Sequence, residues 1–243
     1  MSVHRLPGGA PESVALLGLG PSVSQYLELS KRAGGRMVDE VWGINALGDV
    51  FACDRVFHMD DVRIQQLRAA ERPESNIARM LAWLRRHPGP VYTSRTHEAY
   101  PGLVEFPLTE VVARFGQAYF NSTAAYAVAY AVYLGVKRLE VYGFDFTYPN
   151  AHHAEKGRAC VEFWLGIAVA NGVDVKVPHA SSLLDACTPE ERLYGYDTLE
   201  VEFKRENGAL STVLTPKDAI PTADEIEARY DHTAHPNPLM SAA

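Results

Sequence analysis

An apolar run that ends in a glycine-rich turn is the feature that most constrains how this chain can fold. Residues 14–17 are apolar, and the next five read Gly-Leu-Gly-Pro-Ser. Gly20 permits a positive φ and the close approach of another backbone or a ligand, and Pro21 suits the first position of a helix. The N–H groups of residues 22–24 then lie at the positive end of the helix dipole, where phosphate is the usual occupant. The pattern predicts a phosphate-binding strand-to-helix turn; the alternative is a tight turn without a ligand.

The composition is that of a globular protein with a buried core. Of the 243 residues, 47% are hydrophobic and 22% are charged, which is normal for a single α/β domain. The net charge of -7 argues against nonspecific binding of nucleic acid, which needs clustered lysine and arginine. Cys53, Cys160 and Cys187 lack the spacing of a disulfide framework or a zinc site. We find no secretory segment and no apolar run that could span a bilayer, so we expect a cytoplasmic protein.

Predicted strands and helices alternate over residues 13–197. The strands fall at residues 14–17, 38–45, 55–59, 91–94, 104–106, 138–142 and 173–177. The helices fall at residues 23–33, at 64–87 with a break at Pro73, at 122–134 and at 158–171. This alternation predicts a single α/β domain with a mostly parallel sheet and helices on both faces. Residues 198–243 break the pattern and are expected to form a C-terminal extension, with an edge strand (199–204), a helix (223–230) and a loose tail (232–243).

Polar residues gather at the carboxyl ends of the predicted strands, where an open α/β sheet binds its ligand. Besides the first loop they are Asn45, Asp60 with Asp61, Asp145, and the loop of residues 148–153 with its two histidines, His152 and His153. Each also has a structural interpretation: a turn cap for the asparagine, helix caps for the aspartate pair, a loop hydrogen bond for Asp145 and a solvated pair for the histidines. Because all of them share one edge of the sheet, we predict a ligand site there.

Several of these segments resemble the bacterial sialyltransferases that build host-mimicking lipooligosaccharides. Residues 18–22 (GLGPS), 42–45 (WGIN) and 56–59 (VFHM) are similar to the family's G-N-G-P-S, a strand ending in C-N and a strand ending in F-Y-N. Residues 122–126 (STAAY) and 134–146 (LGVKRLEVYGFDF) are closer to its T-S-G and A-x-x-L-G-x-K-E-I-Y-L-x-G-I-D-F. His152 stands ten residues before Glu162, as the family's catalytic histidine does, and residues 178–184 resemble C-P-N-S-L-L. The similarity covers roughly residues 13–186 and implies a Rossmann-like, GT-A-like fold.

In the sialyltransferases the matching positions hold a cytidine monophosphate donor. The resemblance therefore implies that the following residues bind the nucleotide: Gly18, Gly20, Pro21, Ser22, Asn45, Ser122 and Thr123, with Asn121 beside them. It also implies that His152 is the general base that removes a proton from an acceptor hydroxyl, with Asp145 as a second catalytic residue. A histidine suits this role because its unperturbed pKa is about 6.5.

Two departures from the family concern the transferred group. Leu19 stands where the family has an asparagine, and only six residues separate Asp145 from His152, where the sialyltransferases carry a long lid. The same skeleton also resembles the 6-hydroxymethylpterin pyrophosphokinase (MptE-like) proteins, which have a G-x-G-P-S-L start and an acidic pair after the third strand. For this second resemblance, Asp60 and Asp61 imply an Mg²⁺ ion that carries ATP.

Three functions therefore remain open. The first is a sialyltransferase-like glycosyltransferase that uses a nucleotide-linked sugar donor, such as a CMP-sugar, and a histidine base. The second is an MptE-like pyrophosphokinase that uses ATP and Mg²⁺. The third is a protein that binds a nucleotide metabolite without turnover. In each of them the partners are small molecules and not nucleic acid.

Overall fold

The computed structural model describes residues 10–146, 150–187 and 193–228. The chain divides into two compact units, Met1–Cys187 and Thr188–Ala243. The sequence predicted a domain of residues 13–197 and a C-terminal extension of residues 198–243. Among the described residues, no helix is long and apolar enough to cross a membrane.

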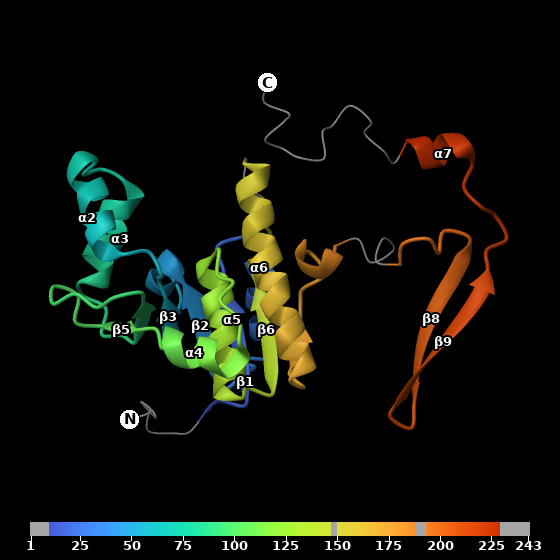
Figure 1. Ribbon diagram of the computed structural model, residues 1–243, viewed down its shortest axis with the longest axis horizontal. Coiled ribbons are helices and arrows are strands. Elements are labelled where there is room, and N and C mark those ends of the chain that lie inside the picture. Colours follow the sequence, from blue (N-terminus) through green and yellow to red (C-terminus); the bar gives the residue numbers. More distant parts are fainter. Residues whose placement is uncertain (1–9, 147–149, 188–192, 229–243) are drawn as a thin grey trace. The chain divides into compact units, whose positions relative to one another are not determined.

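Seven parallel strands form the sheet of the first unit (Figure 1). In spatial order they are β5 (Leu103–Glu105), β4 (Val91–Thr93), β3 (Arg55–Phe57), β2 (Glu40–Ile44), β1 (Ser13–Leu17), β6 (Arg138–Tyr142) and β7 (Asp174–Lys176). Every neighbouring pair is parallel, so all carboxyl ends lie at one edge. The chain builds outward from β1 to β5 and then crosses to β6 on the other side of β1. The predicted α/β, Rossmann-like fold is confirmed.

Helices cover both faces of this sheet (Figure 1). One face packs against α4 (Leu108–Phe115), α5 (Thr123–Leu134) and α6 (Ala151–Ala170). The other face packs against α1 (Val23–Arg32) and the 3-10 turn η1 (Asn45–Asp49), and further along against α2 (Val62–Glu71) and α3 (Asn76–Leu84). The sequence analysis missed α4. A second 3-10 turn, η2 (Leu183–Asp185), follows β7.

Helix α6 begins earlier than predicted. The expected start was residue 158, whereas the helix runs from Ala151, so His152 and His153 belong to its first turn and not to a loop. Asn150 caps this turn, because its Oδ1 accepts the backbone N–H of His153 at 3.0 Å. Tyr148 and Pro149 of the predicted loop lie outside the described residues. The asparagine cap is a local signal for this helix start that the sequence analysis did not use.

The alanine-rich helix α5 packs against the sheet, as its composition predicts. Its small buried side chains are Ala124, Ala125, Ala127, Ala129 and Ala131. Side chains of this size let the helix backbone approach the strands closely. Gly135 ends the helix in the left-handed region, with φ of 80°, as the predicted C-cap requires.

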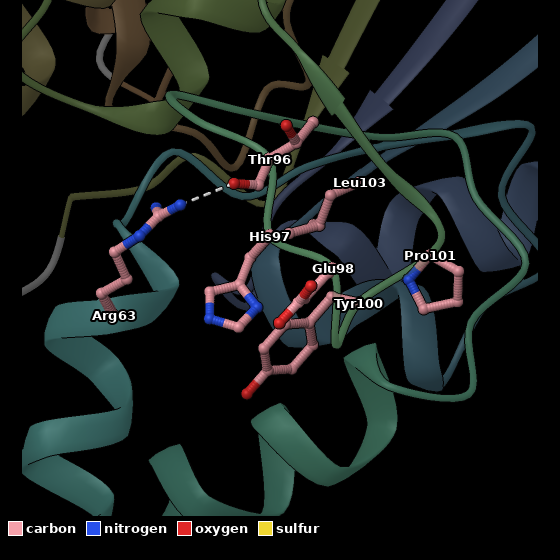
Figure 2. Close-up of a pocket in the computed structure, with 7 residues that line it drawn as sticks. All are labelled: Arg63, Thr96, His97, Glu98, Tyr100, Pro101 and Leu103. Carbon is pink, nitrogen blue, oxygen red and sulfur yellow. Dashed lines mark hydrogen bonds between the residues drawn. The ribbon is translucent and has the colours of Figure 1, made fainter.

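The connection between β4 and β5 folds against α2. Arg63, in the first turn of α2, donates from Nη2 to the carbonyl oxygen of Thr96 at 2.8 Å (Figure 2). Gln66 donates from Nε2 to the hydroxyl of Tyr100 at 3.2 Å. The ring of Tyr100 is buried in a cluster with residues of α3 and β4. The β4–β5 connection contains no helix or strand, and these contacts hold it in place.

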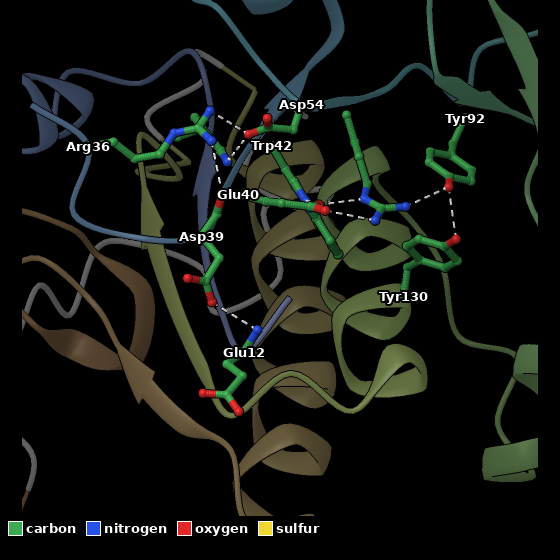
Figure 3. Close-up of polar contacts among 10 residues, drawn as sticks. Glu12, Arg36, Asp39, Glu40, Trp42, Asp54, Tyr92 and Tyr130 are labelled. Atoms are coloured by element: carbon green, nitrogen blue, oxygen red, sulfur yellow. Dashed lines mark hydrogen bonds and ion pairs between the residues drawn. The ribbon is translucent and has the colours of Figure 1, made fainter. Parts of the chain in front are cut away.

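A buried ion pair joins the amino-terminal ends of β2 and β3 (Figure 3). Arg55 donates from Nε and Nη2 to the two carboxylate oxygens of Glu40, at 2.6 and 2.9 Å. Its Nη1 donates to the hydroxyl of Tyr92 at 3.0 Å, and that hydroxyl lies 2.8 Å from the hydroxyl of Tyr130. The indole of Trp42 also donates to Glu40, at 2.6 Å. A bidentate arginine–carboxylate pair of this kind has a defined geometry and ties the two strands together.

The second unit contains a β-hairpin of β8 (Leu199–Glu206) and β9 (Ala209–Pro216), followed by the short helix α7 (Ala223–Glu227). The strand expected at residues 199–204 forms as β8 and pairs with β9 in a two-stranded sheet. Asn207 and Gly208 form the turn with φ of 52° and 82°, which a two-residue hairpin of this type requires. Thr222 and Glu225 form a capping box at α7. The expected tail lies outside the described residues.

Candidate functional site

The loops that follow β1 and β6 lie against each other at the carboxyl edge. The N–H of Gly18 donates to the carbonyl of Tyr142 at 2.7 Å, and the N–H of Gly20 donates to the carbonyl of Gly143 at 2.8 Å. The hydroxyl of Ser22 accepts the N–H of Gly143 at 2.8 Å. The chain order reverses between β1 and β6, and a ligand of an open α/β sheet binds at such a point.

The two glycines of the first loop are required by protein packing. Neither has a positive φ. A Cβ on Gly18 would lie 2.4 Å from the carbonyl oxygen of Gly143, and a Cβ on Gly20 would lie 2.5 Å from Oδ2 of Asp145. The close approach that the sequence predicted is therefore real, but the group that approaches belongs to the protein itself.

Asp145 occupies the helix terminus that was predicted to bind phosphate. Its Oδ2 accepts the N–H of Ser22 at 2.7 Å, and the residue is 5% exposed. The next two N–H groups are also bonded: Val23 donates to Gly20 and Ser24 donates to Pro21, both at 3.1 Å. The expectation of three outward-facing N–H groups is thus wrong. A phosphate placed here would meet the negative charge of a carboxylate that already interacts with the helix dipole.

The loop after β7 fixes Asp145 from its other side. The hydroxyl of Ser182 donates to the carbonyl of Asp145 at 2.7 Å, and that of Ser181 donates to the carbonyl of Phe144 at 3.1 Å. Three loops therefore hold this aspartate in one position. Its second carboxylate oxygen, Oδ1, is buried and has no hydrogen-bond partner among the described residues.

A single methyl group at Gly20 is expected to destabilise the protein without any ligand. In Gly20→Ala the new Cβ would overlap Oδ2 of Asp145 and come within 2.9 Å of the carbonyl oxygen of Gly143. Overpacking of this kind costs about 1–3 kcal/mol, which urea denaturation measures. Gly166→Ala is the matched control, because Gly166 lies in α6 with open space around its Cβ position. It should gain up to about 1 kcal/mol. Equal stability of the two variants would contradict the packing argument.

Asn45 and His58 form a hydrogen-bonded pair at the ends of β2 and β3. Nδ1 of His58 lies 3.0 Å from Oδ1 of Asn45, whose backbone has a positive φ of 51°. Because Oδ1 can only accept, Nδ1 carries the proton of this bond. Burial lowers the pKa of His58, and the nearby negative charge of Asp60 opposes that effect. The sequence analysis identified Asn45 as a site residue but missed His58, although a histidine inside an apolar strand end was visible as a signal.

Ser122 and Thr123 begin helix α5 at the same edge of the sheet. Oγ of Ser122 accepts the N–H of Ala125 at 3.4 Å and lies 3.5 Å from Sγ of Cys160, so the serine serves as the helix cap. Asn121 is exposed beside it. The first N–H groups of a helix, here those of Thr123 and Ala124, have no partner within their own helix.

His152 lies in the first turn of α6, which follows β6. Because α6 returns the chain to β7, parallel to β6, its N-terminus lies at the carboxyl edge of the sheet. His152 is half-buried and His153 is exposed. The role of His152 as a base stays a prediction.

The two aspartates after β3, Asp60 and Asp61, differ in their surroundings. Asp61 caps α2: its Oδ1 accepts the N–H of Arg63 at 2.8 Å and lies 3.4 Å from the guanidinium of the same residue. The hydrogen bond from the Arg63 backbone lowers the pKa of Asp61. Asp60 is exposed. In the part of the chain that the structure describes, no three His, Cys, Asp or Glu side chains come together as a metal site, so metal binding by Asp60 and Asp61 stays a prediction.

A surface hollow of about 490 Å³ lies beside this cap, between α2 and the β4–β5 connection (Figure 2). Its lining residues are Arg63, Thr96, His97, Glu98, Tyr100, Pro101 and Leu103. None of the residues predicted from the sequence lines it. In the figure, the guanidinium of Arg63 reaches toward Thr96, and the ring of His97 lies between Arg63 and the ring of Tyr100.

In comparisons with known proteins, no protein-family model and no curated protein matches this chain.

Proposed function

We propose that this chain is a nucleotide-dependent group transferase, in the first place a sialyltransferase-like glycosyltransferase, and that its ligand binds at the carboxyl edge of the sheet. Among the described residues, four buried side-chain nitrogen or oxygen atoms have no hydrogen-bond partner. Three of them lie at the ends of β3, β4 and β6: His58 Nε2, Thr93 Oγ1 and Asp145 Oδ1. The fourth, Nε of Arg138, lies 3.2 Å from Glu140 in an ion pair. Buried polar atoms without partners are rare, so their concentration at this edge supports a polar ligand there.

The start of α5 is the better position for the phosphate of the donor. Asp145 already accepts the N–H of Ser22 at the start of α1. The resemblance to the sialyltransferases assigns Ser122 and Thr123 to the donor, and the N–H groups of the first turn of α5 favour an anion. Asn45 then remains for the nucleoside, and Asp145 holds the loops in place as a positioning residue.

The proposal requires a single displacement step that begins with an acceptor hydroxyl. His152 takes the proton of this hydroxyl while the hydroxyl oxygen forms a bond to the transferred group. The bond from that group to the nucleotide phosphate breaks, and the nucleotide leaves with the electron pair. The donor, the acceptor and His152 supply every atom that takes part in this step, so its atoms and charges balance without a metal ion.

A thermal-denaturation panel of CMP, CDP, UDP, GDP and ATP, with and without Mg²⁺, tests the proposal. A ligand at about 100 times its Kd should add about 2.7 kcal/mol of stability, which corresponds to a Tm increase of about 5–10 °C. Stabilisation by cytidine nucleotides in the presence of EDTA is the expected result. If none of these nucleotides raises Tm, the proposal of a nucleotide-dependent enzyme is refuted.

The same panel separates the other two functions. A response to ATP that EDTA abolishes would favour the MptE-like pyrophosphokinase, and Asp60→Asn should then weaken it. Asp61 supports that alternative less, because its carboxylate caps α2. Tight nucleotide binding without release of any product would favour a binding protein. Asp60 is exposed, so its carboxylate is accessible to the Mg²⁺ ion that the panel adds with ATP.

A further inference from the structure

His58 and Thr93 occupy neighbouring positions at the carboxyl ends of β3 and β4. The register pairs Phe57 with Tyr92, whose rings stack with centroids 5.0 Å apart. The N–H of His58 continues this ladder by donating to the carbonyl of Tyr92 at 2.8 Å. One step along the register, His58 therefore comes beside Thr93. Successive side chains of a strand alternate between the two faces of the sheet. The side chains of His58 and Thr93 therefore lie on the same face as that of Val56, and the stacked rings lie on the other face.

Both side chains are buried and each has a polar atom without a partner. His58 and Thr93 are 0% exposed. Nε2 of the histidine and Oγ1 of the threonine make no hydrogen bond to the described residues, nor to each other. Burial of two unpaired polar atoms on adjacent strands is unfavourable for the free protein, and it becomes favourable when a third group joins them.

The chemistry of the two atoms defines that group. Nδ1 of His58 donates to Asn45, so the neutral ring presents Nε2 as a bare acceptor. The hydroxyl of Thr93 can both donate and accept. A hydroxyl group fits the pair: it donates to Nε2 of His58 and accepts from Oγ1 of Thr93. An amino group also donates to Nε2. An anion does not fit, because the imidazole lone pair and the nearby carboxylate of Asp60 would repel it.

We propose that His58 and Thr93 form a specificity subsite for a neutral hydroxyl or amino group of the bound nucleotide. This inference rests on the proposed function, since it takes the nucleotide as the ligand. The proposed function assigns Asn45 to the nucleoside and the start of α5 to the phosphate. Asn45 follows β2 directly, and its side chain is hydrogen-bonded to His58. The subsite therefore lies next to the position where a nucleoside is expected.

The first arm of the test needs no ligand. In Thr93→Val a methyl group replaces the hydroxyl at nearly equal volume. If the hydroxyl is unpaired in the free protein, Tm should stay unchanged or rise by up to about 4 °C. Thr109→Val is the control, because Thr109 is exposed on α4, at the opposite face of the sheet. A fall in Tm of several degrees for Thr93→Val alone would mean that a buried water already satisfies the hydroxyl, and it would overturn the subsite.

The second arm measures nucleotide affinity by calorimetry, with CMP or ATP as the probe according to the panel. Thr93→Val should weaken binding about tenfold even though it does not lower Tm. His58→Asn keeps a polar atom near Nδ1 but removes Nε2, and it should weaken binding to a similar extent. His58→Gln places an amide near the position of Nε2 and should restore most of the affinity. A purely structural role would not produce opposite effects on stability and binding.

Nucleotide analogues identify the bound group. A 2′-deoxy nucleotide removes a ribose hydroxyl, whereas UMP in place of CMP, or ITP in place of ATP, removes the amino group of the base. The analogue that lacks the bound group should lose about tenfold in affinity for the wild type and almost nothing for Thr93→Val. Nucleotide binding that is equal in all variants would refute the subsite and leave the proposed function standing. Absence of any nucleotide binding to the wild type would refute both.

Discussion

Replacing His152 with alanine is expected to lower the rate of group transfer by roughly 10²–10⁴-fold, with the affinity for the donor unchanged. Under the proposed function, this histidine removes the proton of the acceptor hydroxyl, so its loss raises the barrier of that step alone. The donor identified by the thermal panel serves as the substrate. Initial rates give the effect on transfer, and calorimetry gives the donor affinity of the variant.

His153→Ala is the matched control for this prediction. The two histidines are adjacent in the first turn of α6, and His153 is the more exposed of them. The control variant should keep nearly the full rate. A large loss of rate in His153→Ala, together with a normal rate in His152→Ala, would show that His153 is the general base. Normal rates in both variants would show that the base lies elsewhere.

Replacing Glu40 with leucine is expected to cost about 3–5 kcal/mol of folding stability. The side chain of Arg55 is 3% exposed, whereas that of Glu40 is 21% exposed, so the arginine cannot turn to water when its carboxylate partner is removed. Among the described residues, its guanidinium would keep a hydrogen bond to the hydroxyl of Tyr92 and contacts with the rings of Trp42 and Tyr130, none of which carries a negative charge. An uncompensated buried charge of this kind is strongly unfavourable. Denaturation in guanidinium chloride measures the loss.

The exposed ion pair between Arg36 and Asp54 supplies the comparison. Its atoms lie 2.6 Å apart, as close as those of the buried pair, but its side chains are 45% and 33% exposed. Arg36→Met should therefore cost less than about 1 kcal/mol, since water screens the pair and solvates the partner that remains. If Glu40→Leu costs as little as Arg36→Met, then burial does not govern the strength of the Arg55 pair.

Local sequence determined the elements of the main sheet. Every strand of that sheet overlaps a predicted strand. The signal is strongest for the central strand β1, which is buried along nearly its whole length and is therefore almost entirely apolar. The alanine-rich helix and its terminal Gly135 were also predicted correctly, since small residues and a left-handed C-cap act within one helix. The hairpin turn was missed although Asn207-Gly208 is a local signal for it. These features depend on neighbours in the chain.

The contents of the candidate site depend on residues that are distant in the chain. Ser22 and Asp145 are separated by 123 positions, and no local pattern shows that this carboxylate fills the start of α1. Likewise, Asn45 and His58 meet only because β2 and β3 are neighbours in parallel register. Hydrophobic patterning determines which segments are buried, because burial of apolar area has no direction. A hydrogen bond requires its donor and acceptor to lie about 3 Å apart with defined angles, so only the packed tertiary structure decided which polar atoms were paired and which were left for a ligand.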